Sequence, residues 1–156
     1  MSLLIEYEEA RSAEDVARVR RVMALRAMLA DGMTQREIAA ALGVSQPAIS
    51  QQLRSMAVTD IDAVTAVTAG GPIIRELAEQ RGFSDLAVFG SVARGESRPG
   101  SDIDLLVRPP EGTTIKGIQA LRDMFEQVLG HPVDVVSYGG LKPGIDDDVR
   151  REAVLV

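Results

Sequence analysis

Apolar positions in the first third of the chain recur every three or four residues. This period runs over residues 6–29, with arginines on the other faces, and predicts a long helix. Two shorter helices are expected at residues 35–42 and 45–56, because Ser45 can cap a helix N-terminus and Gly43 can form the turn between them. This part of the chain is therefore predicted to be helical throughout.

The second half of the chain has a different pattern. Short apolar runs predict strands at residues 85–90, 102–108 and 133–138, and a helix over residues 115–129 separates the last two. A short helix followed by an apolar tail is expected from residue 149 onward. An all-helical part is thus followed by a part that mixes strands and helices.

Glycines and a proline mark the boundary between these two parts. Residues 61–71 are expected to form a linker with a short helical piece that ends at Gly70 and Gly71. Pro72 then begins a helix that continues to about Gln80. The expected organisation is a first domain at residues 1–60, this linker, and a second domain at residues 72–156.

Composition narrows the classes of protein. Of the 156 residues, 46% are hydrophobic but only 3% are aromatic, so the core must be aliphatic. Cysteine is absent, which excludes disulfides and thiolate metal sites and is compatible with a cytoplasmic location. No apolar run approaches the roughly 20 residues that a membrane span needs, so no membrane association is expected.

Charge is unevenly distributed along the chain. The net charge is -6, yet residues 16–58 contain six arginines against Asp31 and Glu37. Such asymmetry is expected if one part of the chain meets phosphate groups while the other handles a metal ion or a different partner.

The turn at Gly43 organises a predicted pair of short crossing helices. Such helices need a small residue where they touch, which Ala39 provides, and a residue that tolerates positive φ at the turn. The second helix would expose side chains that can bind bases and phosphates. These candidate DNA-binding residues are Ser45, Gln46, Ser50, Gln51 and Arg54.

This segment resembles the helix-turn-helix of bacterial transcriptional regulators over about 25 residues. The resemblance implies binding to operator DNA, and a homodimer on a two-fold operator is the natural expectation. The alternative is a helical hairpin that only packs or dimerises.

The stretch FGSVARGESRPGSDIDLLV, residues 89–107, carries the candidate chemistry. Asp102 and Asp104 are one residue apart on a predicted strand, so their side chains project to the same face and repel unless a cation lies between them. Mg²⁺ suits such carboxylates together with substrate phosphates. Asp134, on a neighbouring predicted strand, would complete a metal site able to activate an attacking hydroxyl. The three aspartates are therefore predicted to be both metal ligands and catalytic residues.

A nucleotide-binding role is predicted for the residues just upstream. Gly90 would let the backbone approach a phosphate group, and Ser91 offers a hydroxyl and an N–H to triphosphate oxygens. Arg94 and Arg98 could neutralise charge there. The chemistry that these parts imply is in-line nucleotidyl transfer with pyrophosphate as the leaving group.

The same stretch is similar to the minimal nucleotidyltransferases of the polymerase-β-like superfamily. Their pattern of G-S, ten residues and D-x-D is met by Gly90-Ser91 and Asp102-x-Asp104, and the resemblance covers residues 73–156, including LKPGIDDDVRREAV. It implies a small mixed sheet with helices on one face. Together with the all-α helix-turn-helix domain before it, this gives an expected fold class of α+β (α/β). The resemblance also implies Mg²⁺-dependent transfer of a nucleotide from ATP or another nucleoside triphosphate.

The resemblance also suggests a partner. Members of this branch are often antitoxins encoded beside a helical toxin of the HEPN type, and some silence it by attaching AMP to a tyrosine. Members that act on small molecules usually carry an extra C-terminal substrate domain, whereas this sequence ends soon after Asp134. The acceptor is therefore expected to be presented by a macromolecule that docks onto an open cleft.

Three hypotheses follow from the sequence. The favoured one is a DNA-binding antitoxin that modifies a co-encoded partner protein. A second is a regulator whose transferase fold only binds nucleotide or a partner, and a third is a small-molecule nucleotidyltransferase. His131, the single histidine, is interpreted as a turn residue before Pro132.

Overall fold

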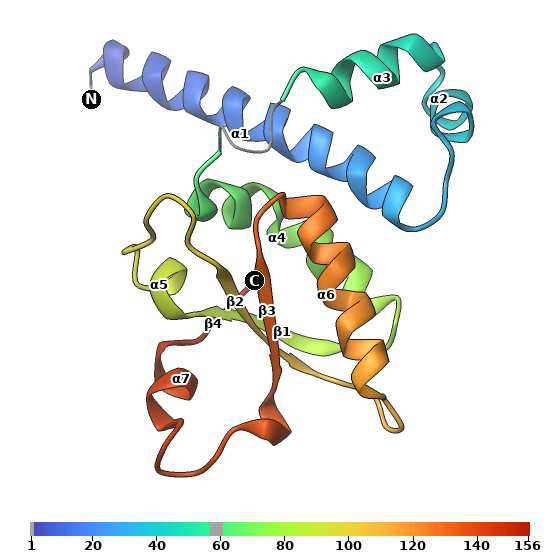
Figure 1. Ribbon diagram of the computed structural model, residues 1–156. Coiled ribbons are helices and arrows are strands. Elements are labelled where there is room, and N and C mark those ends of the chain that lie inside the picture. Colours follow the sequence, from blue (N-terminus) through green and yellow to red (C-terminus); the bar gives the residue numbers. More distant parts are fainter. Residues whose placement is uncertain (1, 57–60) are drawn as a thin grey trace.

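The computed structural model describes residues 2–56 and 61–156 of the chain, in which a helical N-terminal part is joined to a mixed sheet (Figure 1). Its N-terminal helices are α1 (Leu3–Ala30), α2 (Gln35–Leu42) and α3 (Gln46–Arg54). The Thr34 hydroxyl accepts a hydrogen bond from the Glu37 N–H, and the Glu37 carboxylate accepts one from the Thr34 N–H. This reciprocal capping fixes where α2 begins.

The turn between α2 and α3 has the conformation that the sequence predicts. Gly43 has φ 69° and ends α2, and the Val44 N–H donates to the Ala39 carbonyl at 3.0 Å. Ala39 is buried between the helices together with Ile38 and Ile49. The two short helices therefore pack on each other in the helix-turn-helix arrangement.

The second half of the chain folds into a four-stranded mixed sheet. Its order is β3-β2-β1-β4, with β2 and β3 parallel and the other two pairs antiparallel. The strands are β1 (Ser84–Phe89), β2 (Ile103–Arg108), β3 (Val133–Ser137) and β4 (Val154–Leu155). The expected mixed sheet and the α+β fold class are confirmed.

Helices α4 (Ala63–Glu79) and α6 (Ile115–Leu129) cover one face of this sheet. The aliphatic core lies between them and alternate residues of β2, among them Ile103 and Leu105. The opposite face carries a smaller apolar cluster around Leu106. Near it lie η2 (Tyr138–Gly140) and α7 (Asp147–Glu152), whereas Val92 of the short helix α5 (Gly90–Ala93) packs into the main core.

The segment predicted as a linker is helical. Residues 63–71 form the first half of α4, and Pro72 lies inside this helix rather than at its start. Gly70 and Gly71 do not end a helix; both are buried where α4 meets its neighbours. A Cβ at Gly70 would lie 2.6 Å from Leu129 Cδ2, and one at Gly71 would lie 2.7 Å from Val156 Cγ1. Gly70 therefore allows close packing against α6, and Gly71 allows close packing against the C-terminal tail. Their sequence context does not distinguish this role from a turn.

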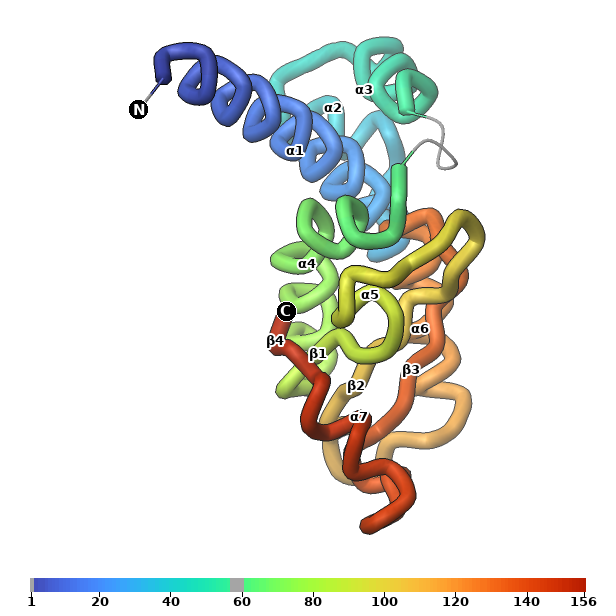
Figure 2. Tube along the Cα trace, turned by 90° about the vertical axis from the view of Figure 1, so that its left-hand side faces the viewer, coloured from blue at the N-terminus to red at the C-terminus, as the bar shows by residue number. Residues whose placement is uncertain are grey.

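Helix α1 belongs to both parts of the molecule. Val19 and Met23 pack into the main core with α4 and the sheet, whereas Leu25 packs with Ile38 and Ile49 of the helix-turn-helix. Figures 1 and 2 show α1 lying across one end of the sheet domain, with its N-terminal half extending beyond it. No helix among the described residues is both long enough and apolar enough to cross a membrane.

Candidate functional site

Two of the three candidate carboxylates lie side by side on the sheet. Asp104 of β2 is paired with Asp134 of the parallel strand β3 and with Phe89 of the antiparallel strand β1. Paired residues on adjacent strands point to the same face, which here is the face opposite to α4 and α6. Asp102 precedes Asp104 by two residues and is exposed. The sheet thus brings two carboxylates to one face, and Asp102 lies near enough for its charge to act on Asp104.

Negative charge is concentrated at Asp104. Burial raises the pKa of this half-buried carboxyl group above its ordinary value, and the charges of Asp134 and Asp102 raise it further. The Arg94 guanidinium acts in the opposite direction. Like charges raise the pKa of a carboxyl because they disfavour its ionised form, so a cation or a positively charged partner at this position would relieve repulsion.

The carboxylates on this face provide part of the donor set of a divalent cation. Among residues 2–56 and 61–156, no group of three or more His, Cys, Asp or Glu side chains is arranged to hold a metal ion by itself. Mg²⁺ is commonly bound by one or two carboxylates, with waters and substrate phosphates filling the other positions. The carboxylates of Asp104 and Asp134, which are neighbours across β2 and β3, are ligands of the kind that Mg²⁺ takes, with substrate oxygens as the remaining donors.

Gly90 forms a tight bend against Asp104. It has φ 71°, a conformation that side-chain-bearing residues rarely adopt. A Cβ at this position would lie 2.2 Å from Asp104 Oδ2. Only glycine therefore lets the chain turn from β1 into α5 directly beside the carboxylates, with Ser91 as the next residue of α5.

A fourth carboxylate, Glu152 of α7, contacts this bend. Glu152 Oε1 accepts a hydrogen bond from the Gly90 N–H at 2.9 Å, and Glu152 Oε2 accepts one from Arg94 Nη1 at 2.8 Å. These two bonds lower the pKa of Glu152. Arg94 Nε also donates to Glu96 Oε2 at 3.0 Å. Sequence reasoning did not single out Glu152, since its position depends on how the C-terminal tail pairs with β1.

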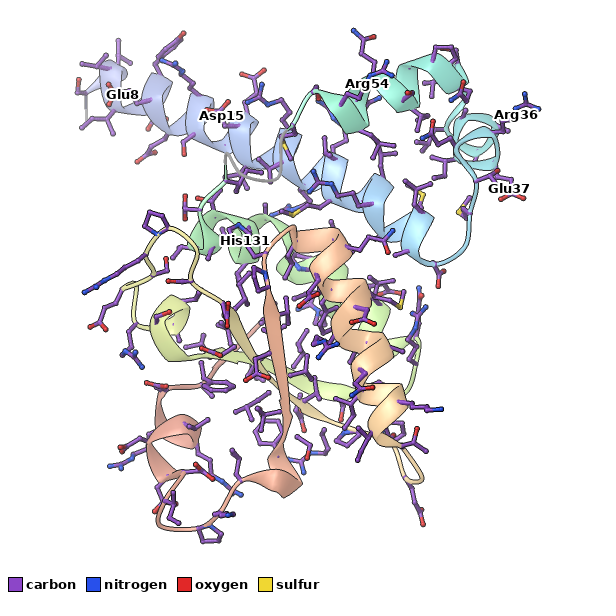
Figure 3. All side chains as sticks on the ribbon, viewed as in Figure 1. Glu8, Asp15, Arg36, Glu37, Arg54 and His131 are labelled. Atoms are coloured by element: carbon purple, nitrogen blue, oxygen red, sulfur yellow. The ribbon has the colours of Figure 1, made fainter. Side chains whose placement is uncertain are left out.

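Arg98 and His131 lie at a separate cavity of about 270 Å³, which Asp62 also lines. His131 Nε2 is 2.7 Å from the Ile61 carbonyl oxygen. Figure 3 shows His131 close to the start of α4, between α1 and the sheet. The histidine therefore tethers the chain before α4, which agrees with a role in the turn rather than in chemistry.

The candidate DNA-binding residues lie along α3 and at its N-terminus. Ser45 caps the helix, since its hydroxyl accepts a hydrogen bond from the Ala48 N–H at 3.3 Å. Gln46 is exposed, but its amide donates to Gln35 Oε1 at 2.7 Å. Gln51 and Arg54 are exposed and Ser50 is half-buried. Figure 3 shows Arg54 on α3, on the side of α1 away from His131.

Comparisons with protein-family models give one match for each part of the chain. The model described as "Nucleotidyltransferase domain" matches residues 72–156. The model described as "Bacterial regulatory protein, arsR family" matches residues 18–57. The two matches do not overlap, and the helix-turn-helix lies within the second of them.

Individual proteins match roughly half of the chain. The protein adenylyltransferase MntA of Thermococcus cleftensis is 40% identical over 82 residues, which are 53% of this chain and 83% of that protein. MJ0435 of Methanocaldococcus jannaschii, provisionally named a protein adenylyltransferase, is 39% identical over 75 residues, covering 48% of this chain and 81% of that protein. A solved structure provisionally described as a minimal nucleotidyltransferase is similar with a TM-score of 0.57 and 39% identity, covering 63% of this chain and 99% of that chain.

Proposed function

Since the chain belongs to the family of nucleotidyltransferase domain proteins and carries a helix-turn-helix, we propose that it transfers AMP from ATP to a partner protein and binds operator DNA. The observation that carries the transfer is the shared face of Asp104 and Asp134 beside the Gly90 bend. Both relatives described above are named protein adenylyltransferases, one of them provisionally. These names support AMP as the transferred group and a protein as the acceptor.

The proposed reaction follows from the chemistry of these side chains. A hydroxyl oxygen of the acceptor protein attacks the α-phosphorus of ATP, the bond from that phosphorus to the bridging oxygen breaks, and pyrophosphate leaves. Asp134, the more exposed carboxylate of the pair, accepts the hydroxyl proton. Ser91 and Arg94 bind oxygens of the departing pyrophosphate, because a hydroxyl and a guanidinium both donate hydrogen bonds to phosphate.

Magnesium is part of this proposal. Asp104 and Asp134, with Asp102 beside them, would hold the ion, which would supply charge neutralisation at the phosphates. Asp104 supports this assignment because its surroundings disfavour an unaccompanied negative charge.

The test uses labelled ATP, Mg²⁺ and the protein encoded by the adjacent reading frame. We expect the label on that partner, and we expect Asp104→Asn and Asp134→Asn to abolish transfer. Asp123→Asn is the matched control, since Asp123 is an exposed aspartate on α6 that pairs with Arg122. A wild-type chain that binds ATP yet never labels the partner would instead favour a regulator that only binds nucleotide.

The proposed biological role is that of an antitoxin. AMP attached to a toxin would block its action, and operator binding by the helix-turn-helix would let the same chain control transcription of the pair. Co-expression provides the test: the wild-type chain should relieve growth arrest by the co-encoded protein, and the Asp104→Asn variant should not. Equal protection by both would contradict silencing by nucleotidyl transfer.

A further inference from the structure

We propose that Glu152 is a positioning residue of the nucleotide site: its carboxylate holds the Gly90 bend and Arg94 in the arrangement that receives the triphosphate. This inference rests on the proposed function, because it assigns a role in binding the same ATP. It adds the C-terminal segment, α7 and β4, to the nucleotide site.

The register of the C-terminal strand places Glu152 at the bend. In the antiparallel pair of β1 and β4, Ala87 is opposite Leu155 and Val88 is opposite Val154. Continuing this register by two residues brings Gly90 opposite Glu152. The hydrogen bond from the Gly90 N–H to Glu152 therefore extends the contact between the two strands beyond their ends.

The two oxygens of this carboxylate hold the two ends of α5. One accepts from Gly90, the first residue of α5, and the other accepts from Arg94, the residue that ends it. The backbone of α5 is held by few hydrogen bonds, which the N–H groups of Arg94, Gly95 and Glu96 donate to carbonyls within the helix. An external carboxylate that bonds to both ends therefore limits how far Ser91, which lies between them, can move.

The ion pair between Glu152 and Arg94 is partly shielded from water. The Glu152 side chain is only 25% exposed, compared with 46% for Arg94. Hydrogen bonds between charged groups are stronger than those between neutral groups. On its other side Gly90 packs against Asp104, so the bend is held between Asp104 and Glu152.

Two carboxylates orient the guanidinium of Arg94. Glu152 and Glu96 bind its Nη1 and Nε atoms, respectively. Its guanidinium has further N–H groups that can still donate to phosphate oxygens. Without Glu152 the long side chain would be tethered by the exposed Glu96 alone.

The test is calorimetric titration of the full chain with a non-hydrolysable ATP analogue and Mg²⁺. Glu152→Ala is expected to weaken binding by about tenfold, the effect of losing a charge-assisted hydrogen bond. Glu152→Gln is expected to be intermediate, since its amide oxygen still accepts from the Gly90 N–H but the charge opposite Arg94 is lost. Asp148→Asn, which removes a charge from the same helix at a residue that pairs with Arg151, is expected to bind like the wild type.

Amide hydrogen exchange without nucleotide gives an independent readout. Exchange at residues 90–94 should accelerate in Glu152→Ala and be partly restored in Glu152→Gln, while exchange in α6 stays unchanged. Affinity in Glu152→Ala equal to or tighter than in the wild type would overturn the proposal, because the carboxylate would then be irrelevant to phosphate or compete with it. Failure of the proposed function is distinguishable: the wild type itself would bind no nucleotide, and exchange at Gly90 would still decide whether Glu152 holds the bend.

Discussion

Gly90, at the bend between β1 and α5, has less room for a side chain than Gly95, which follows α5. Gly90 and Gly95 have nearly the same backbone conformation, with φ 71° and φ 69°. A Cβ at Gly90 would collide with Asp104, whereas one at Gly95 would meet nothing within 4 Å. The pair therefore separates the cost of backbone conformation from the cost of a steric clash.

We expect Gly95→Ala to destabilise the protein by about 1 kcal/mol, the cost of a left-handed residue with a side chain. Gly90→Ala should cost roughly 2 kcal/mol more, because Asp104 must also move. Urea unfolding of the two variants measures the difference. Nucleotide binding should be lost in Gly90→Ala alone, and equal stability of the two variants would contradict the contact.

The pKa of Asp104 predicts a pH dependence of stability. Because it is raised above the ordinary value of 3.8 in the folded chain, the folded state retains a proton that the unfolded state releases just above that pH. Stability from this group therefore falls as the pH rises from about 3.8 through the folded-state pKa, and it stays low at neutral pH. Asp104→Asn should be more stable than the wild type at neutral pH. Its stability should also lack the decrease with rising pH that the Asp104 carboxyl group causes.

Denaturant unfolding at a series of pH values from acid to neutral measures this effect as the difference between variant and wild type. Taking the difference is necessary because Glu152, whose pKa is lowered, contributes stability that is lost as the pH falls. Asp123→Asn provides the control for removing a carboxylate elsewhere. An Asp104→Asn protein less stable than the wild type at neutral pH would contradict the sign.

At the scale of elements, α3 is the expected reading helix, and its side chains are not equivalent. Gln46 is tied to Gln35 of α2 in the free protein, so it must release that bond before it can contact a base. Gln51 and Arg54 need no such rearrangement within the described contacts, and both are exposed. The two residues therefore offer the clearer tests of DNA binding.

Gln51→Ala is expected to reduce preference for the operator over other DNA, by about 1–3 kcal/mol if the amide reads a base. Arg54→Ala should weaken binding to all DNA and reduce the salt dependence of affinity by about one unit of slope. Fluorescence anisotropy with operator and scrambled duplexes at several salt concentrations measures both. Unchanged affinity for DNA in both variants would contradict a role for α3 in DNA binding.

Local sequence patterns predicted some elements well and others poorly. The turn at Gly43, the Ser45 cap of α3 and the strands beside Asp104 and Asp134 depend on neighbouring residues, and the sequence predicted each of them. The continuous helix α4 and the role of Glu152 depend on contacts with distant segments. Gly70 packs against Leu129, and Glu152 reaches Gly90 only because β4 pairs with β1. Patterns along the chain do not encode such pairings.

At the scale of the whole molecule, α1 links two cores of unequal size. Among the residues that the structure describes, the buried members of the cluster under the helix-turn-helix are Leu25, Ile38, Ala39 and Ile49. The cluster under the sheet is much larger and includes Met23 of the same helix. Because α1 is anchored in the larger core, loss of the smaller one should leave most of α1 and the sheet folded.

This arrangement predicts different outcomes for two truncations of fully buried side chains. Ile49→Ala and Met23→Ala each remove packing contacts worth about 2–5 kcal/mol. Ile49→Ala should increase amide exchange in α2 and α3 only, so that DNA binding is lost and nucleotide binding is kept. Met23→Ala should increase exchange in α1, α4 and the sheet as well, because Met23 lies against Gly70 at the junction of α1 and α4. Equal amide exchange in the sheet of both variants would mean that the two cores unfold as one unit. In that case no core substitution of this kind could abolish DNA binding and leave nucleotide binding intact.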